Sequence, residues 1–107
     1  RRMLSIQHNA QSHLINLDDV LKVNTGKKGQ GKTEVVFERH KLDCNLSLSQ
    51  LLGKLPRDFI QINRFDAINI AWISMVDQSE RQVHLRNGIV CDIGDPFYKD
   101  LMKALTE

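Results

Sequence analysis

Residues 59–70 have the sequence FIQINRFDAINI, which follows a Leu-Pro pair at positions 55 and 56. Apolar residues dominate both ends of this stretch, and a polar corner that contains Asn63, Arg64 and Asp66 interrupts them. Two apolar runs separated by polar residues are typical of two strands joined by a turn. We therefore predict a strand pair that carries Arg64 on its connecting loop, where a rigid scaffold can present a polar side chain for recognition.

The segments on either side of this stretch predict more short strands. Runs that are β-branched or alternate in polarity occupy residues 4–7, 13–17, 20–23, 34–40, 41–46, 74–76, 82–86 and 89–93. We expect the last of the apolar residues in the stretch to continue directly into the strand at 74–76. Asn87-Gly88 is a preferred pair for a two-residue hairpin turn, because both residues tolerate positive φ. The predicted fold is mainly β, with many short antiparallel strands in small packed sheets.

Two short helices, at about 47–55 and 96–106, complete the predicted fold. Ser47 and Gln50 have the spacing of a capping box, in which each side chain bonds a backbone N–H of the other residue. Asp95 precedes a proline, so we expect Asp95 to be the N-cap of the second helix. A proline at position 56 is expected to end the first helix.

Length and composition predict one water-soluble domain. The chain has 107 residues, of which 41% are hydrophobic and 26% charged, with a formal net charge of +2. This charge permits nucleic-acid binding without arguing for it. We expect Cys44 and Cys91 to be buried free thiols in a reducing compartment, with a disulfide as the alternative. The first residues, Arg1-Arg2-Met3, suggest a segment excised from a longer protein, and no run is long enough to cross a membrane.

The sequence GKKGQGKT at residues 26–33 matches a phosphate-binding loop. Such a loop needs a helix after it, with Lys32 neutralising phosphate and Thr33 holding Mg²⁺. Residues 34–38 are β-branched and alternating, which favours a strand. The alternatives are a solvated loop or a cation cluster of Lys27, Lys28 and Lys32 that contacts a phosphate backbone. The histidines are scattered, so we expect no metal site and no cofactor.

The stretch at 59–73 resembles the signature of the LytTR DNA-binding domain, found as the output domain of bacterial response regulators. Phe59, Arg64, Asn69 and Ile73 fit this signature. At Asn69, the end of a strand, we expect a structural role that bonds the backbone rather than a DNA contact. The order of an early Asp-containing strand segment, the first helix, the signature, the Asn-Gly hairpin and a terminal helix also fits. The resemblance implies a non-enzymatic, cytoplasmic transcription regulator of a two-component system that binds duplex DNA. It further implies dimers on repeated half-sites, formed through another domain.

The same resemblance implies which residues contact DNA. It assigns DNA contacts to the loop with Lys27, Lys28 and Lys32 and to the corner with Arg64. A guanidinium offers two parallel donors that match guanine O6 and N7 in the major groove. The alternative is that Arg64 pairs with Asp66 or simply lies exposed. Asn63 either bonds a base or phosphate, or closes the turn through its own backbone.

Three positions depart from the family pattern. Asn63 stands where His is usual, Phe65 where Ser is usual, and Gly94-Asp95 where a Ser-Arg-like pair is usual. An aspartate in the last region would repel phosphate. These departures favour a second hypothesis, a protein-interaction module that has the fold without DNA binding. The third is a nucleotide-binding protein, favoured only by the Gly-Lys-Thr loop.

Overall fold

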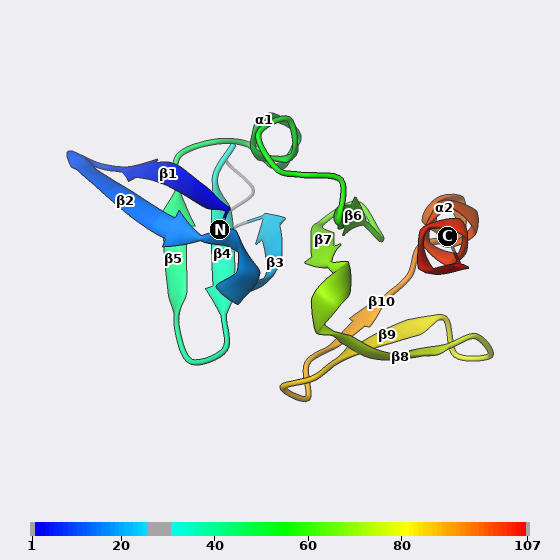
Figure 1. Ribbon diagram of the computed structural model, residues 1–107. Coiled ribbons are helices and arrows are strands. Elements are labelled where there is room, and N and C mark those ends of the chain that lie inside the picture. The colour runs from blue at the N-terminus through cyan, green and yellow to red at the C-terminus, as the bar shows by residue number, and fades with distance from the viewer. Residues whose placement is uncertain (1, 26–30, 107) are drawn as a thin grey trace.

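The computed structural model describes residues 2–25 and 31–106, and Figure 1 shows its ribbon. The described residues form three antiparallel sheets and two α-helices, so the predicted mainly β fold is confirmed. The largest sheet has the order β5-β4-β3-β7-β6. Its strands are β3 (Val20–Thr25), β4 (Thr33–Phe37), β5 (Lys41–Cys44), β6 (Phe59–Gln61) and β7 (Asp66–Asn69).

Two smaller sheets stand beside the five-stranded one. The first is a hairpin of β1 (Met3–His8) and β2 (Gln11–Asn16), joined to β3 by the 3₁₀ turn η1 (Leu17–Asp19). The second has the order β10-β9-β8 and consists of β8 (Ile73–Asp77), β9 (Gln82–Leu85) and β10 (Val90–Asp92). Figure 1 shows the hairpin and β3–β5 in one half of the molecule, and β8–β10 with the C-terminal helix in the other.

Both faces of the central strands are buried, which explains their apolar composition. Neighbouring residues of a strand point to opposite faces. Ala67 packs into a core formed with the β1–β2 hairpin and the first helix, whereas Ile68 packs into a core formed with β8–β10 and the second helix. In β3, Val23 lies in the first core and Leu21 in the second. The central strands therefore divide two hydrophobic cores.

The first helix, α1 (Leu48–Leu52), begins as predicted. The Ser47 hydroxyl accepts from the backbone N–H of Gln50 at 3.2 Å, and the Gln50 side chain accepts from the backbone N–H of Ser47 at 3.0 Å. This capping box satisfies two N–H groups at the start of the helix. The helix ends earlier than the predicted residue 55, because the following residues form tighter turns with N–H to carbonyl bonds three residues apart, as from Leu55 to Leu52.

Three local predictions differ from the structure. The apolar run after β7 is broken by the 3₁₀ turn η2 (Ile70–Trp72), because the Asn69 side chain accepts a bond from the backbone N–H of Ala71. The Asn-Gly hairpin closes through a bond between Leu85 N–H and the Ile89 carbonyl, so its loop has three residues. Of the Asn-Gly pair, only Gly88 has positive φ. The third difference concerns Asp95, which lies at the candidate site described below.

Candidate nucleic-acid interface

The corner that carries Arg64 joins β6 to β7, which pair antiparallel as predicted. Asn63 fixes this corner from within: its Oδ1 accepts from the backbone N–H of Phe65 at 2.7 Å and from that of Asp66 at 2.9 Å. Such a turn holds the backbone without help from solvent. Arg64 is exposed and makes no hydrogen bond or ion pair within the part of the chain that the structure describes. Its guanidinium lies over the Phe65 ring, 5.6 Å from the ring centroid, and its N–H donors stay open to a partner.

The amide nitrogen of Asn63 is also engaged. It donates to Asp66 Oδ2 at 3.0 Å and to the backbone carbonyl of Asp92 at 2.7 Å. Asn63 thus closes the turn and ties it to the end of β10. Asn63 was expected either to close the turn or to bond a base or phosphate, and these four bonds agree with turn closure.

Asp66 pairs with Lys22 of β3, at 2.8 Å between carboxylate oxygen and ammonium nitrogen. The two side chains are only 15% and 18% exposed, so the pair is partly desolvated. Sequence reasoning considered Asp66 as a partner for Arg64 and overlooked Lys22. No local pattern signals this pair, because the partners lie 44 residues apart and meet only through the pairing of β3 with β7.

Cys91 lies beneath this ion pair, with its Sγ 3.8 Å from the Lys22 ammonium. Burial raises the pKa of the Cys91 thiol, and the positive charge of Lys22 acts in the opposite direction. Cys44 and Cys91 are both buried and free, as expected.

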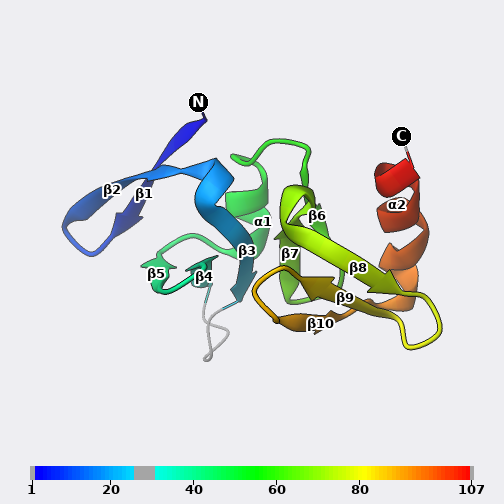
Figure 2. The same cartoon turned by 60° about the horizontal axis from the view of Figure 1, so that its bottom comes forward.

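The ends of the basic loop lie beside the corner. The backbone N–H of Thr25, the last residue of β3, donates to the Phe65 carbonyl at 3.0 Å. Thr25 also pairs with Thr33, the first residue of β4. Lys32 is exposed next to this pair, whereas Lys27 and Lys28 lie outside the described residues. Figure 2 shows the end of β3, the β6–β7 turn and β10 along the same edge of the molecule.

The Gly-Lys-Thr sequence does not meet the requirements of a phosphate-binding loop. Thr33 begins strand β4, and no helix follows it. The Thr33 hydroxyl is buried and has no hydrogen-bond partner among the described residues, so it does not face a site for Mg²⁺. The strand expected at 34–40 is confirmed as β4, which ends at Phe37.

The start of the second helix, α2 (Asp95–Thr106), completes this edge. The backbone N–H of Gly94 donates to the Ile62 carbonyl at 2.8 Å, so this segment packs against the corner. A Cβ at Gly94 would lie 3.2 Å from the Phe97 ring and 3.7 Å from Asn63 Cα. The prediction of Asp95 as N-cap is wrong, because helical bonding starts one residue earlier, where the Gly94 carbonyl accepts from Phe97 N–H. Asp95 still places a negative charge in the first turn.

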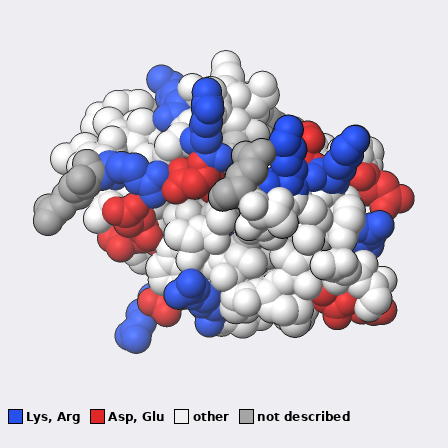
Figure 3. All heavy atoms as spheres, turned by 45° about the vertical axis from the view of Figure 1, so that its right-hand side comes forward, with Lys and Arg blue, Asp and Glu red and all other residues white. Residues whose placement is uncertain are grey.

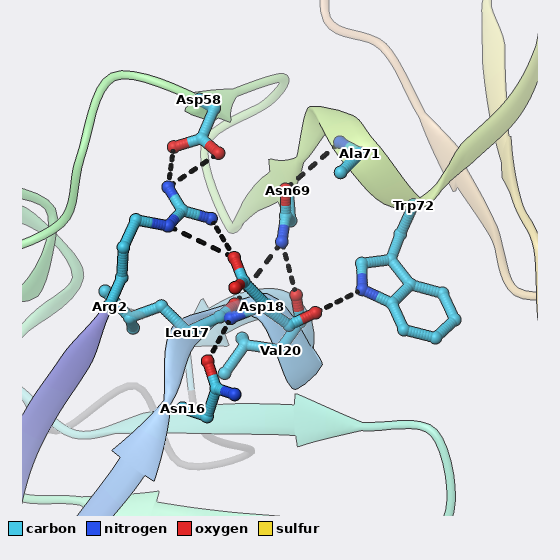
Figure 4. Close-up of polar contacts among 9 residues, drawn as sticks. All are labelled: Arg2, Asn16, Leu17, Asp18, Val20, Asp58, Asn69, Ala71 and Trp72. Atoms are coloured by element: carbon cyan, nitrogen blue, oxygen red, sulfur yellow. Dashed lines mark hydrogen bonds and ion pairs between the residues drawn. The ribbon is translucent and has the colours of Figure 1, made fainter.

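A second polar cluster anchors the far ends of β6 and β7 (Figure 4). Arg2 bonds the Asp58 carboxylate at 2.8 Å and the Asp18 carboxylate at 2.6 Å. The hydrogen bonds to Asp58, and next those to Asp18, raise the pKa of Arg2. Asn69 confirms its expected structural role: its buried Nδ2 donates to the Val20 carbonyl at 2.9 Å. These contacts fix β7 to the η1 turn, away from the corner.

Charged side chains occur in small groups on the one face that Figure 3 draws. On the face drawn in Figure 3, Lys and Arg side chains lie along the upper rim with acidic side chains between them, and the centre is largely uncharged. Within residues 2–25 and 31–106 there is no group of three or more side chains suited to hold a metal ion. In the same residues, neither helix has the length and apolar content needed to cross a membrane.

The comparisons with known proteins agree with this fold. The LytTr DNA-binding domain family matches residues 10–106, and the chain belongs to this family. Its fold is similar to a solved structure described as a LytTr DNA-binding domain of a methyl-accepting/DNA response regulator from Bacillus cereus. The two share 19% identity and a TM-score of 0.80, over 100% of this chain and 99% of that one. No similar sequence was found among curated proteins. The family resemblance of the signature is therefore confirmed.

Proposed function

We propose that this domain binds duplex DNA in a sequence-specific manner, as the output domain of a bacterial transcription regulator in the cytoplasm. One observation carries the proposal: in a chain of the LytTr family, an exposed Arg64 stands on a turn whose backbone Asn63 fixes with two hydrogen bonds. A fixed backbone reduces the conformational entropy lost when a side chain binds. The domain acts by binding, without catalysis.

The proposed interface uses two kinds of contact, one with a base and the others with phosphates. Arg64 reads a guanine, because its parallel donors match O6 and N7 in the major groove. Lys27, Lys28 and Lys32 neutralise phosphates, which provides affinity without sequence information. The exposed position of Lys32 and the bond from Thr25 to Phe65 support a basic loop next to the corner.

Asn63 has a positioning role in this proposal. Its four hydrogen bonds use both the oxygen and the nitrogen of its amide. A base contact would require breaking at least one of them. In this proposal Asn63 orients Arg64, and the ion pair between Lys22 and Asp66 supports that orientation from β3.

The DNA-bound form is a dimer on repeated half-sites, held together by another domain. Two linked domains bind repeated sites more tightly than one, because the second binding event becomes intramolecular. The isolated domain is therefore expected to bind a single half-site weakly.

The test uses a duplex selected from random sequences by this domain and a scrambled duplex. Arg64→Ala should cost about 1–3 kcal/mol on the selected duplex and little on the scrambled one. Joint replacement of Lys27 and Lys28 by Ala should reduce the slope of log affinity against log salt, by about 0.9 for each lost phosphate contact. Arg39→Ala is the matched control, because Arg39 is exposed in the turn at the opposite end of β4 from Thr33. Equal losses for Arg39 and Arg64 would contradict the proposed interface.

The second candidate is a protein-interaction module that does not bind DNA. The exposed Phe65 and the negative charge of Asp95 at the edge of the corner favour it. Absence of any salt-dependent binding to duplex DNA, together with correct folding, would select this candidate.

A further inference from the structure

Phe65 is a large apolar side chain displayed at the tip of the corner. It is 56% exposed, and Val90 beside it is 46% exposed. Both line a surface pocket together with Lys22, Asp66 and Cys91. Exposed apolar side chains that occur singly are ordinary, but here an aromatic ring lies against the exposed Arg64 on a turn with a fixed backbone, which offers a defined contact surface.

The backbone of Phe65 is held on both sides. Its N–H donates to Asn63 Oδ1 at 2.7 Å, and its carbonyl accepts from the N–H of Thr25 at 3.0 Å. These bonds come from two different elements, the turn itself and the end of β3. The ring is therefore displayed by a constrained backbone, which lowers the entropic cost of a contact.

The two exposed side chains lie against each other at the tip of the corner, as a cation–π pair. The Arg64 guanidinium carbon lies 5.6 Å from the centroid of the Phe65 ring. Bases along one strand of duplex DNA are separated by about 3.4 Å along the helix axis. Two groups at this spacing reach base pairs that are one or two steps apart.

We propose that Phe65 contacts the C5-methyl group of a thymine one or two base pairs from the guanine that Arg64 reads. The inference rests on the proposed DNA binding and adds a second specificity contact to it. The thymine methyl is the apolar group that the major groove exposes, and phenylalanine is among the side chains that contact it. Burying one methyl-sized group contributes about 0.8 kcal/mol, which corresponds to about a fourfold change in affinity.

The experiment replaces each thymine of the selected duplex, one at a time, by uracil, which pairs identically but lacks the methyl group. Wild-type protein should lose about fourfold in affinity at one position near the Arg64-dependent guanine. Phe65→Ala should lose a similar factor on the thymine duplex and show no further loss on the uracil duplex. Leu14→Ala is the matched control, because Leu14 is 70% exposed on the remote β2 strand. Thermal melts should show that both variants are folded.

Each alternative outcome is separable. If no uracil substitution weakens the wild type, or if Phe65→Ala remains as sensitive to uracil as the wild type, the thymine contact is wrong while DNA binding stands. If the wild type self-associates in sedimentation, and Phe65→Ala abolishes this self-association but binds the duplex as well as the wild type, the ring belongs to a protein interface and the thymine contact is wrong. If the wild type binds no duplex at any salt concentration, the proposed function itself fails.

Discussion

Replacing Asn69 by alanine removes the buried amide that connects β7 to the η1 turn (Figure 4). Asn69 is 0% exposed. Its Nδ2 donates to the carbonyl of Val20 at 2.9 Å and to that of Leu17 at 3.4 Å. Its Oδ1 accepts from the N–H of Ala71 at 3.1 Å and so caps the η2 turn. One substitution therefore removes a link between two segments and a local cap.

The size of the effect follows from these contacts. The short bond to Val20 contributes about 1 kcal/mol, and its loss leaves a buried carbonyl less well satisfied. The cap at Ala71 contributes about another 1 kcal/mol. Loss of the long bond to Leu17, together with the small cavity that the alanine leaves, costs about 1 kcal/mol more. We expect Asn69→Ala to lower the free energy of unfolding by roughly 3 kcal/mol, a large part of the roughly 5–15 kcal/mol typical of a domain.

Urea denaturation followed by circular dichroism measures this change. With a slope of about 1.5 kcal/mol/M, the midpoint should fall by roughly 2 M. Asn69→Asp keeps the acceptor for Ala71 but loses the donor and buries a charge, so it should destabilise at least as much. Asn45→Ala is the control, because Asn45 is exposed and should change stability by no more than about 0.5 kcal/mol. A loss below about 1 kcal/mol for Asn69→Ala would refute the reasoning.

Three further predictions concern other parts of the chain. Thr33→Val should leave the free energy of unfolding unchanged or raise it by up to about 1 kcal/mol in urea denaturation, because it removes a buried hydroxyl without a partner in the described residues. Calorimetry with ATP and Mg²⁺ should detect no binding to the wild type or to Thr33→Val. Hydrogen bonds from the backbone N–H of Glu80, and next from the Ser79 hydroxyl, lower the pKa of Asp77 in the folded protein. The ionised Asp77 therefore stabilises the fold fully above the pKa that it has in the unfolded chain, and this stabilisation is lost as the pH falls through its pKa in the folded protein. Asp77→Asn should reduce the dependence of the melting temperature on acid pH in thermal melts. Asp95→Asn should raise DNA affinity at low salt, where charge effects are largest, and unchanged affinity would indicate that this segment does not approach DNA.

The local elements were predictable because their determinants are close in sequence. The capping box of Ser47 and Gln50 predicted the start of α1, and alternation predicted β4 after Thr33. The same kind of reasoning misjudged Asp95 and the Asn-Gly hairpin. In both cases the residue types fit two geometries that differ by one residue, and the packing of Gly94 against Ile62 or the bond from Leu85 to Ile89 selects between them.

The candidate site was predicted in part. Arg64 was found because it interrupts two apolar strands, and its exposure agrees with that interpretation. The alternatives for Asn63 remained open, since an asparagine in a turn can bond its own backbone or a ligand. The bond from Asn63 to the Asp92 carbonyl crosses 29 residues of sequence, and no local pattern contains it.

By itself, the sequence determined the strand periods, the helix start at Ser47 and the order of motifs that identifies the family. These features depend on residues within one turn or one strand, where backbone geometry fixes which neighbours meet. Only the tertiary structure decided that Lys22 takes Asp66 and leaves Arg64 exposed, and that Asn63 is fully bonded. The physical reason is that strand pairing brings distant residues together, so competition among polar partners is resolved by the arrangement of β3, β7 and β10.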